Sequence, residues 1–71
     1  MNIHYILASH LSGARQTAGL SQQELADIAG IDRKTVNRIE NQIHSPRLQV
    51  IDALAKALKM SIGDLLTGDM K

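Results

Sequence analysis

The chain contains no cysteine, and Tyr5 is the single aromatic side chain among its 71 residues. Without cysteine it can form no disulfide, no thiolate nucleophile and no cysteine-based zinc site. Modules that bind single-stranded nucleic acid stack bases on several aromatic side chains, so this composition excludes that class. A cysteine-free chain also suits a reducing compartment such as the cytoplasm.

Long apolar runs are missing as well. The longest run, from Tyr5 to Ala8, is far shorter than the roughly 20 apolar residues that a membrane-spanning helix needs. The first basic residue is Arg15, so the beginning of the chain does not have the pattern of a signal peptide. We therefore expect a cytoplasmic protein with no membrane partner.

The remaining composition is that of an ordinary globular domain. Hydrophobic residues make up 44% and charged residues 21%, and the formal net charge is +1. A chain of 71 residues is long enough for one domain, so residues 1–71 are expected to form a single unit. The small net charge says little by itself, and the distribution of the charges is more informative.

The apolar residues recur at helical spacing, with no sustained alternation of the strand type. Leu7, Leu11, Ala14 and Ala18 form one stripe of a first helix, which Gly19 is placed to end. Four further helices follow, each after a typical start signal. These signals are Ser21 with Glu24, Asp32, Ser45 with Pro46, and Ser61. The sequence predicts an all-α fold of five short helices, with Leu48, Ile51, Leu54, Ala55 and Leu58 as the buried stripe of the fourth.

The second and third predicted helices are joined by only about three residues, Gly30 to Asp32, as in a helix-turn-helix. Glycine suits so sharp a turn because it adopts left-handed backbone angles without steric cost. The helix-turn-helix unit is expected at about residues 21–41.

One face of the third helix carries only cationic and amide side chains. At roughly 100° per residue they share an arc of about 140°, opposite Val36 and Ile39. Guanidinium, ammonium and amide groups bind base edges and phosphates in a DNA major groove. The alternative is a solvated basic face, which the turn just before it makes less favourable. The residues on this face are Arg33, Lys34, Asn37, Arg38 and Asn41.

An ordered set of short motifs runs from about residue 7 to residue 66. It consists of Arg15, Gly19-Leu20-Ser21-Gln22, Glu24-Leu25-Ala26, Gly30-Ile31, Val36, Arg38-Ile39-Glu40-Asn41, Ser45-Pro46, Leu54-Ala55-Lys56-Ala57-Leu58 and Asp64-Leu65-Leu66. In this order and spacing, the chain resembles the Cro/CI-type (lambda-repressor-like, XRE) helix-turn-helix family. One departure is Gln42, where the family usually has glycine. Either Gln42 takes the left-handed conformation or the loop differs.

The resemblance implies sequence-specific binding of double-stranded DNA by a transcriptional regulator, a repressor of Cro/CI or controller-protein type, with the third helix in the major groove. It implies a homodimer on a roughly palindromic operator and a structural ion pair between Arg15 and Glu40. The residues implied to contact bases are Arg33, Lys34, Asn37 and Arg38. Those implied to contact phosphates are Gln22, Thr35, Asn41, His44 and Arg47.

Dimerisation is expected to use the fifth helix, because only about five residues follow Leu66 and no separate dimerisation domain is in sight. The apolar side chains there exceed what one side of a short helix can bury. The alternative is that they all cover the fourth helix. The candidate interface residues are Met60, Ile62, Leu65, Leu66 and Met70.

Other classes of function find little support. His4 and His10 are six residues apart rather than the three or four that align two ligands on one helix face, so no metal or other cofactor is expected. No nucleophile lies at helical spacing from a base and an acid, and no glycine-rich phosphate loop is present, so we expect no enzyme. The rival is an antitoxin or adaptor whose main partner is another protein. Antitoxins of this family also bind DNA, whereas an adaptor would not need the basic face.

Overall fold

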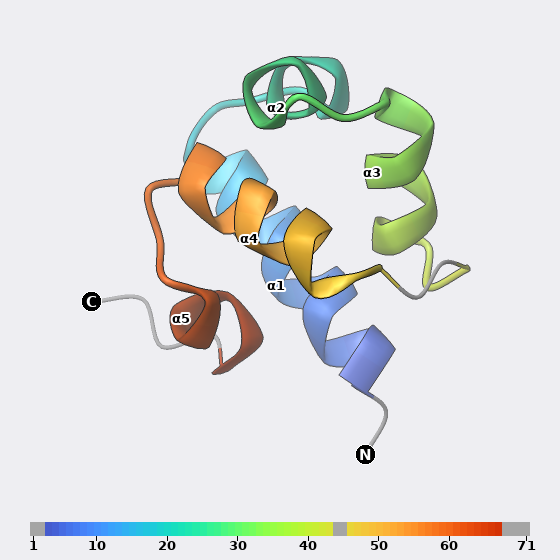
Figure 1. The fold of residues 1–71 in the computed structure, drawn as a ribbon, viewed down its shortest axis with the longest axis vertical. Helices are drawn as coiled ribbons and strands as arrows, with labels where there is room; N and C mark the ends of the chain where they lie inside the picture. The colour runs from blue at the N-terminus through green and yellow to red at the C-terminus, as the bar shows by residue number, and fades with distance from the viewer. Residues whose placement is uncertain (1–2, 44–45, 68–71) are drawn as a thin grey trace.

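The computed structural model describes residues 3–43 and 46–67, and within them the chain is all-α, as the sequence predicts (Figure 1). The helices are α1 (Ile3–Thr17), α2 (Gln22–Ala29), α3 (Arg33–Glu40), α4 (Leu48–Ala57) and α5 (Ile62–Thr67).

The helices wrap around one another with α1 and α4 at the centre. Helix α1 contacts α3 and α5, α2 contacts α3 and α4, and α4 contacts α5. In Figure 1, α3 lies at the right of the molecule and α5 at the lower left, with α4 between them. The helix predicted to read DNA and the helix predicted to dimerise therefore occupy opposite sides of the domain.

All five helices contribute to one apolar core. Its leucine, isoleucine and valine side chains are buried between the helices that contact one another. Burial of this kind is the main favourable contribution to folding in a small domain. The core residues are Leu7, Leu11, Leu25, Ala26, Val36, Ile39, Leu54, Ala55 and Leu65.

The start of α4 differs from the prediction. The helix begins at Leu48, two residues after Pro46, and Arg47 is its N-cap. Ser45 lies outside the described residues. Leu48 was expected in the buried stripe, but 65% of its surface is exposed, so that prediction is wrong. A first-turn residue can satisfy the helical spacing and still project beyond the neighbouring helices, because the stripe does not fix where the neighbours end.

Two serines form the caps that the sequence predicts. Ser21 Oγ accepts from the Glu24 backbone N–H at 3.0 Å, and the Glu24 carboxylate accepts from the Ser21 N–H at 2.8 Å. Ser61 Oγ accepts from the Asp64 N–H at 3.0 Å. Asp32 has the extended backbone of an N-cap, but its side chain makes no capping hydrogen bond, so only its position agrees with the prediction.

The Ser21 capping box makes stability depend on pH. Hydrogen bonds from the Ser21 backbone and, second, its side chain lower the pKa of Glu24 from its usual value. The contribution of the Glu24 charge is therefore complete above the ordinary carboxyl pKa of about 4.3, and it disappears as pH falls through the lower folded-state value. We expect Glu24→Gln to melt below the parent at neutral pH, with the gap in Tm closing on acidification. A gap that stays constant down to acid pH would contradict this.

Candidate nucleic-acid interface

Helices α2 and α3 meet at a sharp turn whose local chemistry explains its shape. Gly30 has φ +73°, in the left-handed region that glycine enters without a Cβ clash. The Ile31 N–H then donates to the Ala26 carbonyl at 3.0 Å, and the Ile31 side chain packs against the core. The turn therefore holds α3 at a fixed angle to α2.

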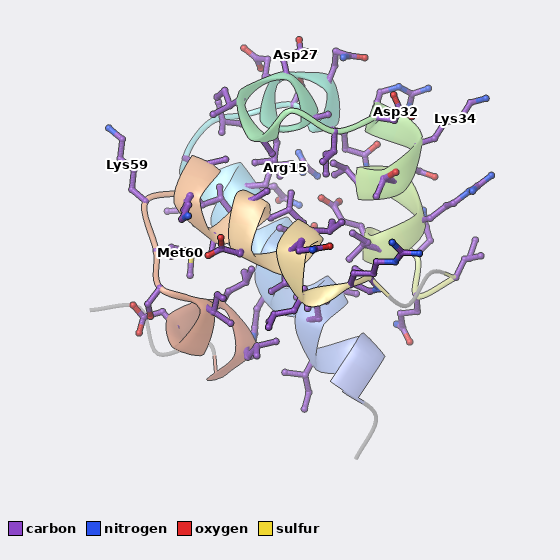
Figure 2. The ribbon with its side chains drawn as sticks, in the orientation of Figure 1. Arg15, Asp27, Asp32, Lys34, Lys59 and Met60 are labelled. Atoms are coloured by element: carbon purple, nitrogen blue, oxygen red, sulfur yellow. The ribbon has the colours of Figure 1, made fainter. Side chains whose placement is uncertain are left out.

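The outer face of α3 is cationic, and its inner face is apolar. Val36 and Ile39 are 0% and 1% exposed, while Arg33, Lys34 and Arg38 all lie exposed. Figure 2 shows Lys34 pointing away from the body of the protein. The structure thus brings three of the four residues predicted to contact bases onto one accessible surface.

The fourth such residue, Asn37, is half-buried, because it faces α2 as well as the surface. Its Nδ2 donates to Gln22 Oε1 at 3.2 Å, and Gln22 Nε2 donates to Glu40 Oε1 at 3.2 Å. Gln22 was assigned to a phosphate from sequence, and this intramolecular role was missed. The spacing of residues in the sequence does not indicate these contacts of Gln22, because its partners lie 15 and 18 residues further along the chain on another helix.

Arg15 and Glu40 form a two-pronged ion pair that ties α1 to α3. Arg15 Nε donates to Glu40 Oε2 at 2.8 Å, and Arg15 Nη2 donates to Glu40 Oε1 at 3.0 Å. Arg15 Nη1 also donates to the Leu20 carbonyl at 2.9 Å. The hydrogen bond to Glu40 is the main cause that raises the pKa of Arg15. The two side chains are only 14% and 7% exposed, so the pair is largely shielded from water.

The predicted phosphate contacts are placed unevenly. Thr35 is half-buried, and Arg47 is exposed at the N-cap of α4. Asn41 is exposed, but its Nδ2 donates to the Asn37 carbonyl of its own helix at 2.8 Å. His44 lies outside the described residues.

The loop after α3 takes the first of the two alternatives left open for Gln42. Gln42 has φ +62°, and the following Ile43 N–H donates to the Arg38 carbonyl at 2.9 Å. A left-handed residue that is not glycine costs on the order of 1 kcal/mol. The chain therefore keeps the sharp loop at some expense in stability.

Helix α5 divides its apolar residues between the core and the surface. Leu65 is 0% exposed and belongs to the core, so its assignment to a dimer interface is wrong: a side chain with no accessible surface has nothing to offer a partner. Met60, Ile62 and Leu66 are half-buried and remain available. Met70 lies outside the described residues.

The one acid within α3, Glu40, is already occupied, while Asp32 lies exposed at the N-cap of the helix. Because Glu40 pairs with Arg15, it does not neutralise the exposed Arg33, Lys34 and Arg38. A group of exposed cations attracts polyanions and raises their rate of association.

Within residues 3–43 and 46–67, no three His, Asp, Glu or Cys residues lie together in a way that could hold a metal. Within the same residues, no helix has the length and apolarity to cross a bilayer.

The structure thus has two short helices joined at a glycine in the left-handed conformation, and the second helix exposes cationic side chains. These features define a helix-turn-helix DNA-binding protein. The comparisons with known proteins agree. Residues 11–65 match the model of the Helix-turn-helix family HTH_3. The chain belongs to this family, of the XRE or Cro/CI type, and it is a DNA-binding regulator of transcription.

Individual relatives lie close in sequence and in structure. The chain is 37% identical over 67 residues to the control protein C.SmaI of Serratia marcescens, covering 94% of this chain and 80% of that protein. The restriction-modification controller protein C.AhdI from Aeromonas hydrophila aligns with a TM-score of 0.85 and 32% identity, over 87% of this chain and 94% of that one. The hypothetical transcription factor NHTF from Neisseria aligns with a TM-score of 0.88 and 32% identity, over 92% and 75% of the two chains.

Proposed function

We propose that the protein is a controller-type repressor that places α3 in the major groove of a roughly palindromic operator. One observation carries this proposal: α3 exposes Arg33, Lys34 and Arg38 on the face opposite the buried Val36 and Ile39. Guanidinium and ammonium groups on such a helix can reach guanine O6 and N7 as well as phosphate oxygens. The likeness to a control protein and to a restriction-modification controller supports the controller type.

In this proposal some residues of the DNA-binding surface contact bases and others contact phosphates. Arg33 and Lys34 begin α3 and read bases, as recognition helices of this class do with their N-terminal residues. Arg38 and Asn37 lie one turn further on and complete the base contacts. Thr35, Asn41, His44 and Arg47 hold phosphates, which fixes the register without reading the sequence. A regulator of this kind acts where the DNA is, and we expect it in the cytoplasm.

The proposal includes a homodimer. One recognition helix buries too little surface for tight and specific binding, and two-fold symmetry doubles it. The half-buried Met60, Ile62 and Leu66 form the candidate interface, on the side of the domain away from α3. Two copies would then read half-sites roughly 34 Å apart, one turn of DNA.

Selection of duplexes from a randomised library tests the function directly. With half-sites one turn apart, a randomised stretch of about 20 base pairs covers both. We expect enrichment of one inverted repeat, and repression of a reporter that carries this repeat across its promoter. A pool that stays unenriched after repeated rounds would count against sequence-specific binding.

Replacing Arg33 and Lys34 by alanine tests the role of α3. Each substitution should cost about 1–3 kcal/mol of binding free energy on the selected site. Lys59→Ala is the matched control, because Lys59 is also an exposed cation but lies far from Lys34 in Figure 2. Fluorescence anisotropy with a labelled duplex measures the affinity of the parent and of each variant. A double Arg33/Lys34 variant that binds as tightly as the parent would rule out this recognition surface.

A further inference from the structure

Four side chains from three helices form a continuous hydrogen-bonded row. Arg15 on α1 pairs with Glu40 on α3, Glu40 accepts from Gln22 on α2, and Gln22 accepts from Asn37 on α3. The row begins at a shielded ion pair and ends at a residue on the proposed DNA surface. Gln22 is the link between the two.

The chemistry of the row fixes which way each amide points. A carboxylate offers only acceptors, so Gln22 must turn its Nε2 toward Glu40, at 3.2 Å. The Gln22 Oε1 is then left for Asn37, whose Nδ2 must donate to it, also at 3.2 Å. Each orientation follows from the one before, and the first is set by the charge on Glu40.

The oriented Asn37 amide retains a donor and an acceptor. Its Nδ2 carries two N–H groups, of which Gln22 uses one, and its Oδ1 is not used by Gln22. One N–H and one carbonyl oxygen on the same amide match N7 and the N6 amino group of adenine in the major groove. A freely rotating amide would present the reverse order equally often and would lose this selectivity.

We infer that Gln22 is a positioning residue, which holds the Asn37 amide in the orientation that reads adenine at one base pair of each half-site. This inference rests on the proposed function, since it requires α3 to lie in the major groove. It also gives Gln22 a different task from the phosphate contact. Both ends of its amide are engaged within the protein, so Gln22 acts on the choice of base. The second N–H of its Nε2 can still reach a phosphate, and the test below separates the two tasks.

The test compares base preferences rather than affinity alone. Duplexes are selected from a randomised library with the parent, with Gln22→Met and with Asn37→Ala, and the preferred site is then varied one base pair at a time in binding assays. Methionine matches glutamine in length but neither donates a hydrogen bond nor accepts a strong one. Gln23→Met is the matched control, because Gln23 is in the same turn but its Nε2 donates to Asp27 at 2.8 Å and not to α3.

We expect one A·T pair per half-site at which the parent discriminates about tenfold or more, and at which Asn37→Ala and Gln22→Met both reduce discrimination to about twofold. Combining the two substitutions should remove little more at that position, because both act through the same amide. Gln23→Met should keep the preferences of the parent. Thermal unfolding monitors whether each variant is folded at the temperature of the binding assay.

Other outcomes would overturn the inference, and they separate it from the proposed function. If Gln22→Met weakens all duplexes equally and keeps every base preference, Gln22 is a phosphate contact only, and DNA recognition by α3 stands. If Asn37→Ala alters no base preference, Asn37 reads no base, while recognition through Arg33 and Lys34 stands. If the parent selects no sequence, both fail. Nuclear magnetic resonance of the parent alone is a second measurement: Asn37 side-chain N–H groups that exchange as fast as those of free asparagine would also overturn it.

Discussion

Glu40→Ala is expected to lower the free energy of unfolding by about 3 kcal/mol, more than removal of a typical surface charge. Removing one partner of a shielded ion pair leaves the other charge without compensation, which costs roughly 3–5 kcal/mol in a fully buried site. Arg15 retains 14% exposure and its bond to the Leu20 carbonyl, which favours the lower end of this range. Chemical denaturation of the parent and the variant measures the difference.

The Asp52–Lys56 pair provides the control. Its nitrogen and oxygen are 3.0 Å apart, but its side chains are 76% exposed at Lys56 and 40% at Asp52. Asp52→Ala should therefore change stability by no more than about 0.5 kcal/mol. An equal cost for Glu40→Ala and Asp52→Ala would show that shielding contributes nothing. Replacing both Arg15 and Glu40 by apolar residues of similar size should restore much of the loss, because neither charge is then stranded.

Leu66→Asp is expected to separate the proposed dimer and to weaken operator binding by about 10²- to 10⁴-fold. A carboxylate in the apolar patch of Met60, Ile62 and Leu66 opposes contact with the same patch on a second copy. A monomer then reaches only one half-site at a time and loses the advantage of linked binding. Sedimentation with and without the selected duplex, together with anisotropy titrations, measures both effects.

Two variants separate this outcome from general damage. Ile28→Asp also places a carboxylate on an exposed apolar position, 59% exposed on α2, but outside the proposed interface, so it should leave two protomers on the operator. Leu65→Ala should instead lower stability by about 2–5 kcal/mol, since Leu65 is fully buried. A full-affinity complex that contains a single protomer would refute the dimer. A free monomer that pairs only on DNA would not.

The fold could be predicted from sequence because its signals are local. The predicted stripe of the first helix and the glycine at position 30 each act within a few residues. The structure follows the stripe from Leu7 to Ala14, but Ala18 lies beyond the end of α1 and is exposed, so its place in the stripe is wrong. The errors arise where a local signal meets a tertiary limit. The Ser45-Pro46 pair looks like a helix start, yet α4 begins at Leu48, and Leu48 projects beyond the core.

The exposed surface of α3 could be predicted for the same reason. The 3.6-residue period decides which residues share the inner face with Val36 and which lie on the outer face. The contacts of Gln22 could not, since they depend on where α2 and α3 come together in space. Leu65 and Leu66 show the same limit on a smaller scale. The two adjacent leucines have the same side chain and the same helix propensity. Only the packing of α5 on α1 and α4 buries the first and leaves the second partly exposed.

The attachment of α3 to α1 links DNA binding to folding through mass action. An isolated helix of eight residues is not stable in water, so α3 exists only while the rest of the domain holds it. Its ion pair to α1 is largely shielded from water, and opening α3 breaks this pair together with the core contacts of Val36 and Ile39. Recognition and global folding therefore behave as one cooperative equilibrium. Operator DNA, which binds only the folded form, should raise the melting temperature in proportion to the logarithm of its concentration.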